Sequence, residues 1–226
     1  MTDVPNPKLD ELVAVLARLR APGGCAWDRE QTHESLVRHL IEEAYELVDA
    51  IESGSRDEVI EELGDVLYQV IFHADIAAHA DRERFDLEDV AARMTSKMIG
   101  RHPHVFGDTT AETADDVIAA WDDLKAVEKP GRTSVLDGIP PAMPSLLLAE
   151  KLLGRADRVG VAVAGAADEE ANFARHFGAL ARIDTEDDLG RALLALVATA
   201  KGRGLDAERA LRGALRDLQA QIRDAE

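Results

Sequence analysis

Hydrophobic side chains recur at helical spacing along most of the chain, and glycine or proline interrupts the pattern between segments. The first such segment, Leu9–Arg20, places a leucine or valine on one stripe at every third or fourth residue and stops at Pro22-Gly23-Gly24. No segment shows strands alternating with helices, so the pattern predicts an all-α fold. The same spacing predicts further helices at about 33–52, 56–80, 87–101, 112–128, 145–158, 169–182, 186–202 and 206–225.

Capping residues and prolines set the boundaries of these helices. Ser55 followed by Glu58, and Thr109 followed by Glu112, have the spacing of a capping box. The third helix, from about residue 56, is apolar nearly all round in its middle, and we expect it to be the most buried. Four prolines crowd the stretch from Lys129 to Pro144. We therefore expect a catalytic domain at 1–130, a linker at 131–144 and a second domain at 145–226.

The amino-acid composition and the net charge exclude some classes of function. Apolar residues make up 46% of the chain and charged residues 31%, as in soluble globular proteins. The formal net charge of −18 argues against nonspecific binding to nucleic acid, because most of the surface repels phosphate. Cys25 is the single cysteine, the start of the chain does not resemble a signal peptide, and no long apolar run exists. We expect a cytoplasmic protein without a membrane span.

Acidic residues among apolar neighbours are the strongest chemical feature. Two patterns stand out: E-E-x-x-E at Glu42, Glu43 and Glu46, and E-x-x-D at Glu62 and Asp65. Residues three apart share a helix face, and the turn at Gly54 makes the two helices antiparallel neighbours, so the two acidic pairs can face each other. Oxygen-only ligands favour Mg²⁺, or alternatively Mn²⁺. The simpler alternative is that these acids form a solvated helix face.

Several ordered blocks of the chain resemble the MazG nucleotide pyrophosphohydrolases. The acidic motifs, with Glu62 and Asp65 inside E-E-L-G-D-V-L, are the first of them. Ala26 stands where the family's entry segment has proline. The resemblance covers about residues 8 to 130, and its other blocks are Gly24–Thr32, Lys97–Phe106 and Trp121–Lys125.

The resemblance implies Mg²⁺-dependent hydrolysis of a nucleoside triphosphate to the monophosphate and pyrophosphate, in the removal of unwanted nucleotides. It places magnesium on Glu43, Glu46, Glu62 and Asp65. Glu42 would position or deprotonate the attacking water, or else be a surface acid. The residues assigned to the substrate are Lys97, Arg101 and Lys125 for phosphates, Trp27 and Trp121 for stacking on the base, and His39. The family is oligomeric, so we expect a homodimer.

The second half of the chain resembles a repeat of the first that has lost its acids. Asp187–Leu194 aligns with Glu61–Tyr68, but Arg191 stands where Asp65 stands in the first half. Glu169-Glu170 is followed by Phe173 in place of a third acid. We expect two tandem MazG-like helical bundles, of which the second is degenerate, does not bind metal, and has a structural or dimerising role.

Two other functional classes compete with this interpretation. A di-iron carboxylate oxidoreductase would use paired Glu-x-x-His motifs, and this chain has one, at Glu30 and His33. A non-catalytic protein that senses nucleotides or binds a partner would not need intact acids in its first half.

Overall fold

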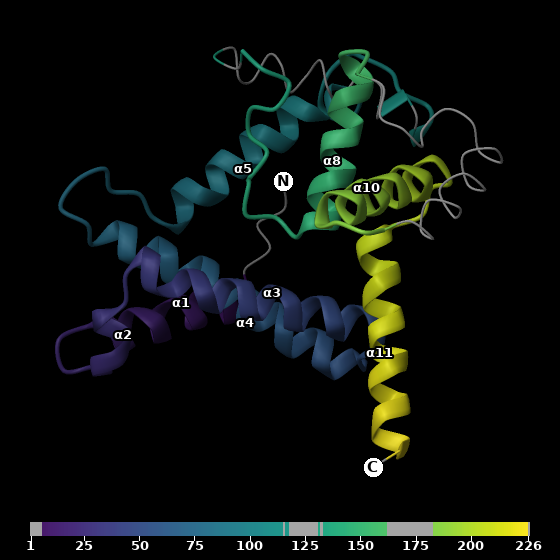
Figure 1. Cartoon of the computed structure of the whole chain (residues 1–226). Helices are drawn as coiled ribbons and strands as arrows, with labels where there is room; N and C mark the ends of the chain where they lie inside the picture. Colours follow the sequence, from purple (N-terminus) through teal and green to yellow (C-terminus); the bar gives the residue numbers. More distant parts are fainter. Residues whose placement is uncertain (1–5, 115, 118–130, 132, 162–182, 226) are drawn as a thin grey trace. The chain divides into compact units, whose positions relative to one another are not determined.

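A computed structural model describes residues 6–114, 116–117, 131, 133–161 and 183–225. Every regular element among these residues is an α-helix (Figure 1). The chain divides into two compact units, residues 1–125 and 126–226. The expected linker, 131–144, lies in the second unit. The all-α prediction is confirmed for the part of the chain that the structure describes.

Two long helices dominate the first unit. α3 (His33–Ser53) and α4 (Arg56–Ala78) form an antiparallel hairpin closed by Gly54 and Ser55. A Cβ on Gly54 would lie 2.7 Å from the Ala50 carbonyl oxygen, so the turn requires glycine. Both helices begin with a capping box, from Thr32 to Ser35 and from Ser55 to Glu58. The register of this hairpin determines which α3 side chains meet which α4 side chains.

The remaining helices of the first unit surround part of this hairpin. α1 (Pro7–Arg20) packs on α2 (Ala26–Glu30) and on α4, while α5 (Leu87–Arg101) packs on α4 and on α6 (Pro103–Phe106). The core forms where α1, α3 and α4 meet, and its buried side chains are Leu16, Leu36, Ile71 and Phe72.

The second unit is built from α8 (Ser145–Arg158), α10 (Glu186–Gly202) and α11 (Ala207–Ala225). All three pack on one another, and Leu153, Val197 and Ala198 form their buried cluster. Thr185 caps α10 by accepting a hydrogen bond from the Asp188 amide. The helix expected at 169–182 lies outside the described residues.

Three local features differ from the sequence predictions. The short helices α2 and α6 occupy segments expected to be loops, and Pro103 begins α6 as its first residue. The helical turn near 114 is capped by Thr113 and Asp116, which exchange hydrogen bonds with each other's amides. The capping box predicted at Thr109–Glu112 is therefore wrong by one turn, because the T-x-x-D motif at 113–116 directly follows the T-x-x-E motif at 109–112.

Burial along α4 is uneven. Its carboxyl-terminal part carries the buried residues Gln69, Ile71, Phe72, Ala74 and Ala77. Among the described helices α4 carries the most buried side chains, as expected, but Leu63, Leu67 and Val70 in its middle are exposed. No helix in the described ranges is long and apolar enough to cross a membrane.

Candidate metal centre

Three carboxylates converge at the middle of the α3–α4 hairpin. Glu43 of α3 and Glu62 and Asp65 of α4 each offer an oxygen, and these oxygens all lie within 4.8 Å of one another. The i,i+3 spacing of Glu62 and Asp65 places both on the α4 face that meets Glu43. The hairpin thus unites the two acidic motifs, as the sequence predicted.

Glu46, the remaining predicted ligand, lies beside this cluster. It shares a hydrogen bond with Glu43, and its charge acts on Glu62. Its oxygens are not part of the group that meets within 4.8 Å. Glu46 is one helical turn beyond Glu43 and reaches the same region from α3.

The electrostatics of the cluster favour a cation. Partial burial raises the pKa of Glu43, and the charges of Asp65, Glu46 and Glu62 raise it further. Burial also raises the pKa of Glu62, followed by the charges of Glu46 and Asp65. Oε2 of Glu62 is buried and has no hydrogen-bond partner among the described residues. An acceptor of this kind, beside two other carboxylates, is suited to a hard metal ion.

The cluster is less deeply placed than expected. Glu43 and Glu62 are half-buried, while Glu42, Glu46 and Asp65 are exposed. Three of the five acids are therefore open to solvent. The solvated-face alternative describes their exposure, but it does not explain the convergence of three carboxylates.

Glu42 points to a different set of partners. One carboxylate oxygen lies 3.4 Å from an Arg38 nitrogen and the other 3.2 Å from Nδ1 of His39. The His39 ring also meets the Trp27 ring edge-on, with centroids 5.8 Å apart. Trp27 of α2, His39 and Glu42 thus form a chain of contacts beside the cluster, and Trp27 leaves half of its surface exposed.

The predicted phosphate-binding residues are further along the chain. Lys97 and Arg101 lie one helical turn apart on α5, which packs on α4 and α6 among the described elements. No described contact tests their assignment to phosphates. Trp121 and Lys125 lie outside the described residues.

A polar groove extends from the cluster toward the Gly54 turn. It encloses about 550 Å³, and sequence reasoning did not single out Asp49, Ser53 or Glu58 on its walls. Asp49 is three residues after Glu46, so the helical period that grouped Glu43 with Glu46 also indicates this position. The other lining residues are Tyr45, Glu46, Ala50, Gly54 and Glu62.

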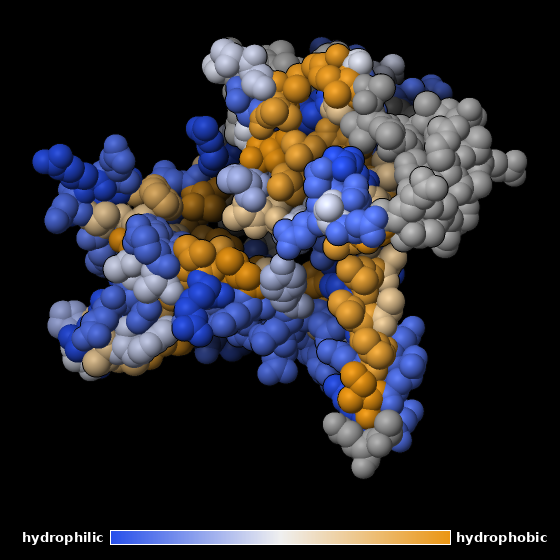
Figure 2. Space-filling view, in the orientation of Figure 1, coloured by the Kyte–Doolittle hydropathy of each residue, from blue (hydrophilic) through white to orange (hydrophobic). Residues whose placement is uncertain are grey.

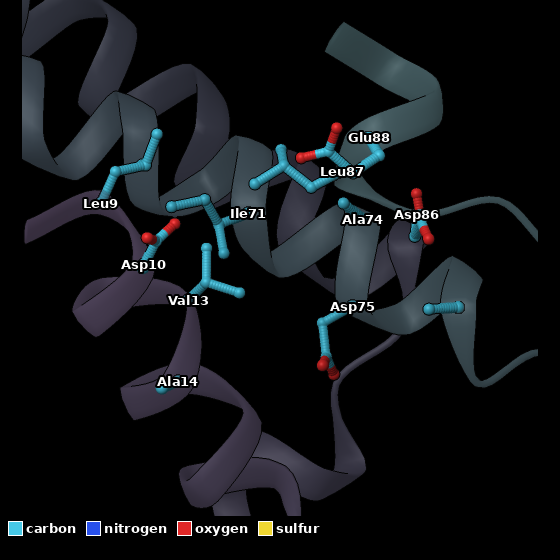
Figure 3. Close-up of a pocket in the computed structure, with 11 residues that line it drawn as sticks. Leu9, Asp10, Val13, Ala14, Ile71, Ala74, Asp75, Asp86, Leu87 and Glu88 are labelled. Atoms are coloured by element: carbon cyan, nitrogen blue, oxygen red, sulfur yellow. The ribbon is translucent and has the colours of Figure 1, made fainter. Parts of the chain in front are cut away.

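A second pocket of about 430 Å³ lies between α1, α4 and the start of α5 (Figure 3). Its walls are mainly aliphatic, with Val13 and Ile71 on opposite sides, and carboxylates of Asp10, Asp75 and Glu88 stand around it. It shares no lining residue with the carboxylate cluster or the polar groove. We do not include it in the candidate metal centre.

The segment expected to correspond to the cluster, in the second unit, contains a cation. Arg191 forms ion pairs with Asp187 and Asp188 on α10. Its hydrogen bond to Asp188 helps lower the pKa of that carboxyl, after the bond from Thr185. The guanidinium already occupies both carboxylates and leaves a net charge of only −1, so this position suits a divalent cation poorly. Glu169, Glu170 and Phe173 lie outside the described residues.

The histidine that a di-iron site would use has another partner. Nδ1 of His33 lies 2.8 Å from Nδ1 of His73 on α4. Among the described residues, Glu30 and His33 do not belong to a group of side chains that could hold a metal ion.

Comparisons with known proteins identify the relatives of this chain. The model of the MazG nucleotide pyrophosphohydrolase domain matches residues 31–106, which include all five acids of the two motifs. The nucleoside triphosphate pyrophosphohydrolase/pyrophosphatase MazG of Thermotoga maritima is 39% identical over 225 residues, covering 96% of this chain and 85% of that protein. The nucleoside triphosphate pyrophosphohydrolase of Escherichia coli K12 is 36% identical over 231 residues, covering 97% and 87%. An uncharacterized 26.1 kDa protein of Streptomyces cacaoi is 45% identical over 224 residues, covering 99% and 85%.

Proposed function

The chain belongs to the MazG nucleotide pyrophosphohydrolase family and is a nucleoside triphosphate pyrophosphohydrolase, and we propose that its catalytic centre is the carboxylate cluster of α3 and α4. The convergence of Glu43, Glu62 and Asp65 is the observation that supports this location. In the reaction, water attacks the α-phosphorus and the bond to the oxygen bridging to the β-phosphorus breaks. The products are the nucleoside monophosphate and pyrophosphate.

The cluster suits Mg²⁺, with Mn²⁺ as an alternative. Its donors are carboxylate oxygens, and the raised pKa of Glu43 reflects partial burial and then the negative charges of its neighbours, which a divalent cation would neutralise. We assign Glu43, Glu46, Glu62 and Asp65 as the ligands. When bound, Mg²⁺ supplies the positive charge that polarises the α-phosphate and stabilises the leaving pyrophosphate.

Glu42 is our candidate for orienting or deprotonating the attacking water. It is adjacent in sequence to Glu43, and Arg38 and His39 contact its two oxygens. These contacts fix the direction of the carboxylate, which a general base requires.

The substrate residues follow from the family motifs and from exposure. Lys97, Arg101 and Lys125 would bind the phosphates, because they are long cationic side chains in the matching blocks. Trp27 would stack on the base, since half of its surface is open and His39 supports its ring edge. Trp121 is the second stacking candidate. We place His39 at the same end of the substrate.

Product analysis of the full-length protein tests this function. Incubation with each nucleoside triphosphate and Mg²⁺ should release pyrophosphate and the monophosphate; release of orthophosphate and the diphosphate would contradict the proposal. Asp65→Ala should reduce turnover by about 10³-fold. Asp188→Ala, at the counterpart in the second unit, is the matched control and should leave turnover nearly intact.

The second unit is proposed to be a degenerate MazG-like repeat that serves structure and dimerisation. Its α10 carries Arg191 where α4 carries Asp65, which supports the loss of metal binding. A stripe of half-exposed apolar side chains runs along α11, as Figure 2 shows; its members are Leu211, Leu215, Leu218 and Ile222. This stripe supports a homodimer. Leu215→Glu should shift sedimentation toward the monomer, whereas Gln219→Glu, also on α11, should not.

The cellular role that we propose is removal of unwanted nucleotides from the cytoplasmic pool. A panel of standard and damaged triphosphates would test it, because a housecleaning enzyme should have a higher kcat/KM for at least one damaged base.

A further inference from the structure

Two histidines join the open end of the α3–α4 hairpin, far along the helices from the Gly54 turn. His33 is the first residue of α3, and His73 lies in the carboxyl-terminal part of α4. Their ring planes differ by 3°, their centroids are 5.1 Å apart and their Nδ1 atoms are 2.8 Å apart. The centroid separation equals the nitrogen–nitrogen distance plus the two ring radii. The rings therefore meet edge to edge through Nδ1.

A proton fits between these nitrogens, whereas a metal ion does not. With the two nitrogens facing each other directly, a zinc ion would need about 2.0–2.1 Å to each of them. The observed separation of 2.8 Å is a normal length for an N–H···N hydrogen bond. One imidazole therefore donates Nδ1–H and the other accepts it.

The second nitrogen of His73 restricts how this bond is made. Nε2 of His73 is buried and has no partner among the described residues. If His33 donated the shared proton, neutral His73 would carry its own hydrogen on Nε2, as a buried N–H without an acceptor. Such orphaned donors are rarer than orphaned acceptors. The geometry therefore favours His73 as the donor, with a bare Nε2, and His33 as the acceptor.

This arrangement cannot take up a further proton. If His33 became protonated on Nδ1, His73 would have to accept and would then carry its hydrogen on the buried Nε2. If His73 itself became protonated, the hydrogen would go to the same buried atom. Every protonated form that keeps the Nδ1–Nδ1 hydrogen bond therefore leaves the buried Nε2–H of His73 without an acceptor. The free-energy cost of this unpaired N–H favours breaking the Nδ1–Nδ1 bond.

We propose that His33 and His73 form a neutral proton bridge that holds the start of α3 against α4, and that gain of one proton opens this end of the hairpin. α2, which carries Trp27, immediately precedes His33 in the chain. Acidification would therefore loosen α2 and the first turns of α3, while the Gly54 end stays paired. The bridge is a pH-sensitive contact between α3 and α4, and it takes no part in the hydrolytic reaction.

The charged groups on the neighbouring helices do not take over the pH response of the His33–His73 bridge. Arg20 of α1 is paired with Asp75 of α4, while Asp86 and Glu88 of α5 line the pocket beside Asp75. Asp28 of α2 acts on Tyr68. Hydrogen bonds from its own backbone and from Thr32 lower the pKa of Glu34 of α3, and His33 adds a smaller effect. Burial, followed by the charge of His33, lowers the pKa of His73.

The sign of the pH effect follows from that direction. The pKa of His73 is lower in the folded chain than its ordinary value of 6.5, so unfolding favours proton uptake. The bridge stabilises the fold fully above the ordinary histidine range. Its contribution is lost as the pH falls below 6.5 toward the lowered pKa.

Imidazole nitrogen NMR on the full-length protein tests the bridge directly. At neutral pH we expect the hydrogen of His73 on Nδ1 and that of His33 on Nε2, and we expect His73 to gain a proton only below its ordinary pKa of 6.5. A hydrogen on Nε2 of His73 at neutral pH would overturn the proposal, as would proton uptake by His73 at or above pH 6.5. This measurement needs no variant.

Hydrogen exchange tests the opening. On going from about pH 7.5 to 5.5, amides of residues 33–40 should lose roughly tenfold more protection than those of residues 47–53, after correction for intrinsic rates. His33→Asn/His73→Asn, which can hydrogen-bond but not titrate, should remove most of this difference, and His79→Asn should retain it. If the double variant does not fold, His73→Asn serves alone. Equal loss of protection at both ends of wild-type α3 would contradict the proposal.

Discussion

Arg20 and Asp75 form an ion pair that joins α1 to α4, with 2.6 Å between Nε and Oδ2 and nearly nine-tenths of each side chain buried. The same guanidinium donates to the Asp28 carbonyl oxygen and lies over the Phe72 ring. Arg20 therefore links the end of α1, the short helix α2 and the core.

Removing one partner of this pair should destabilise the first unit strongly. Asp75→Ala leaves Arg20 as an unpaired, largely buried cation, and we expect a loss of about 3 kcal/mol in the free energy of unfolding. Urea unfolding followed by tryptophan fluorescence measures this, because Trp27 and Trp121 both belong to the first unit. Glu11→Ala breaks the exposed pair with Lys8 in the same unit and should cost less than about 1 kcal/mol. Similar losses for both variants would contradict the structural role of the buried pair.

Magnesium should stabilise the folded protein through the carboxylate cluster. Burial, followed by repulsion among the acids, raises the pKa of Glu43 and of Glu62, so their ionised forms oppose folding at neutral pH. At about one hundred times its Kd, Mg²⁺ should add about 2.7 kcal/mol. Glu62→Gln should melt at the same or a higher temperature without metal, and should gain little from Mg²⁺.

Glu61→Gln is the matched control for this measurement. Glu61 is the exposed neighbour of Glu62 and is not part of the cluster. Its variant should keep the full gain in melting temperature on addition of Mg²⁺. A reduced gain in both variants would mean that net charge, and not the cluster, determines the response.

Substitutions at the adjacent residues Glu42 and Glu43 should change different kinetic properties. Glu42→Gln removes the proposed base and should lower kcat by about 10²- to 10⁴-fold at an unchanged Mg²⁺ requirement. Glu43→Gln should raise the Mg²⁺ concentration needed for half-maximal rate. Steady-state kinetics at several Mg²⁺ concentrations separate these effects. Wild-type kcat in Glu42→Gln would show that Glu42 is a surface acid.

The half-exposed ring of Trp27 should contribute to substrate affinity. Trp27→Ala removes base stacking worth about 1–3 kcal/mol, which corresponds to a rise in KM of about 5- to 150-fold. Trp27→Phe keeps an aromatic face and should recover most of the affinity. KM values for a purine and a pyrimidine triphosphate measure this, and equal KM in all three proteins would exclude Trp27 from the base site.

Local signals in the sequence were sufficient for the long helices and for the meeting of the acids. The bounds of α5, α8 and α10 agree with the periodicity, because the apolar stripe begins after a capping residue in α5 and α10 and after Pro144 in α8. The i,i+3 spacing and one short turn predicted the approach of Glu43 to Glu62 and Asp65. All these features depend on residues close together in the chain.

Features set by packing were not predictable in this way. α2 has five residues and its cap residue, Cys25, makes no side-chain capping bond, so it left no pattern to detect. Periodicity assigns Asp65 to a face of α4 but does not say how far solvent reaches that face. The bridge between His33 and His73 joins positions forty residues apart. A single sequence gives no signal for such a pair unless the hairpin register is already known.

The hairpin of α3 and α4 carries every proposed metal ligand within one uninterrupted stretch, from Glu43 to Asp65. A centre built from such local contacts can assemble early in synthesis, before the second unit has left the ribosome. The hairpin can also be inherited as one contiguous segment of the chain. Duplication of that segment would give a chain two centres at once. One copy could then lose its acids without disturbing the other. Arg191 marks the copy in which we infer that this happened.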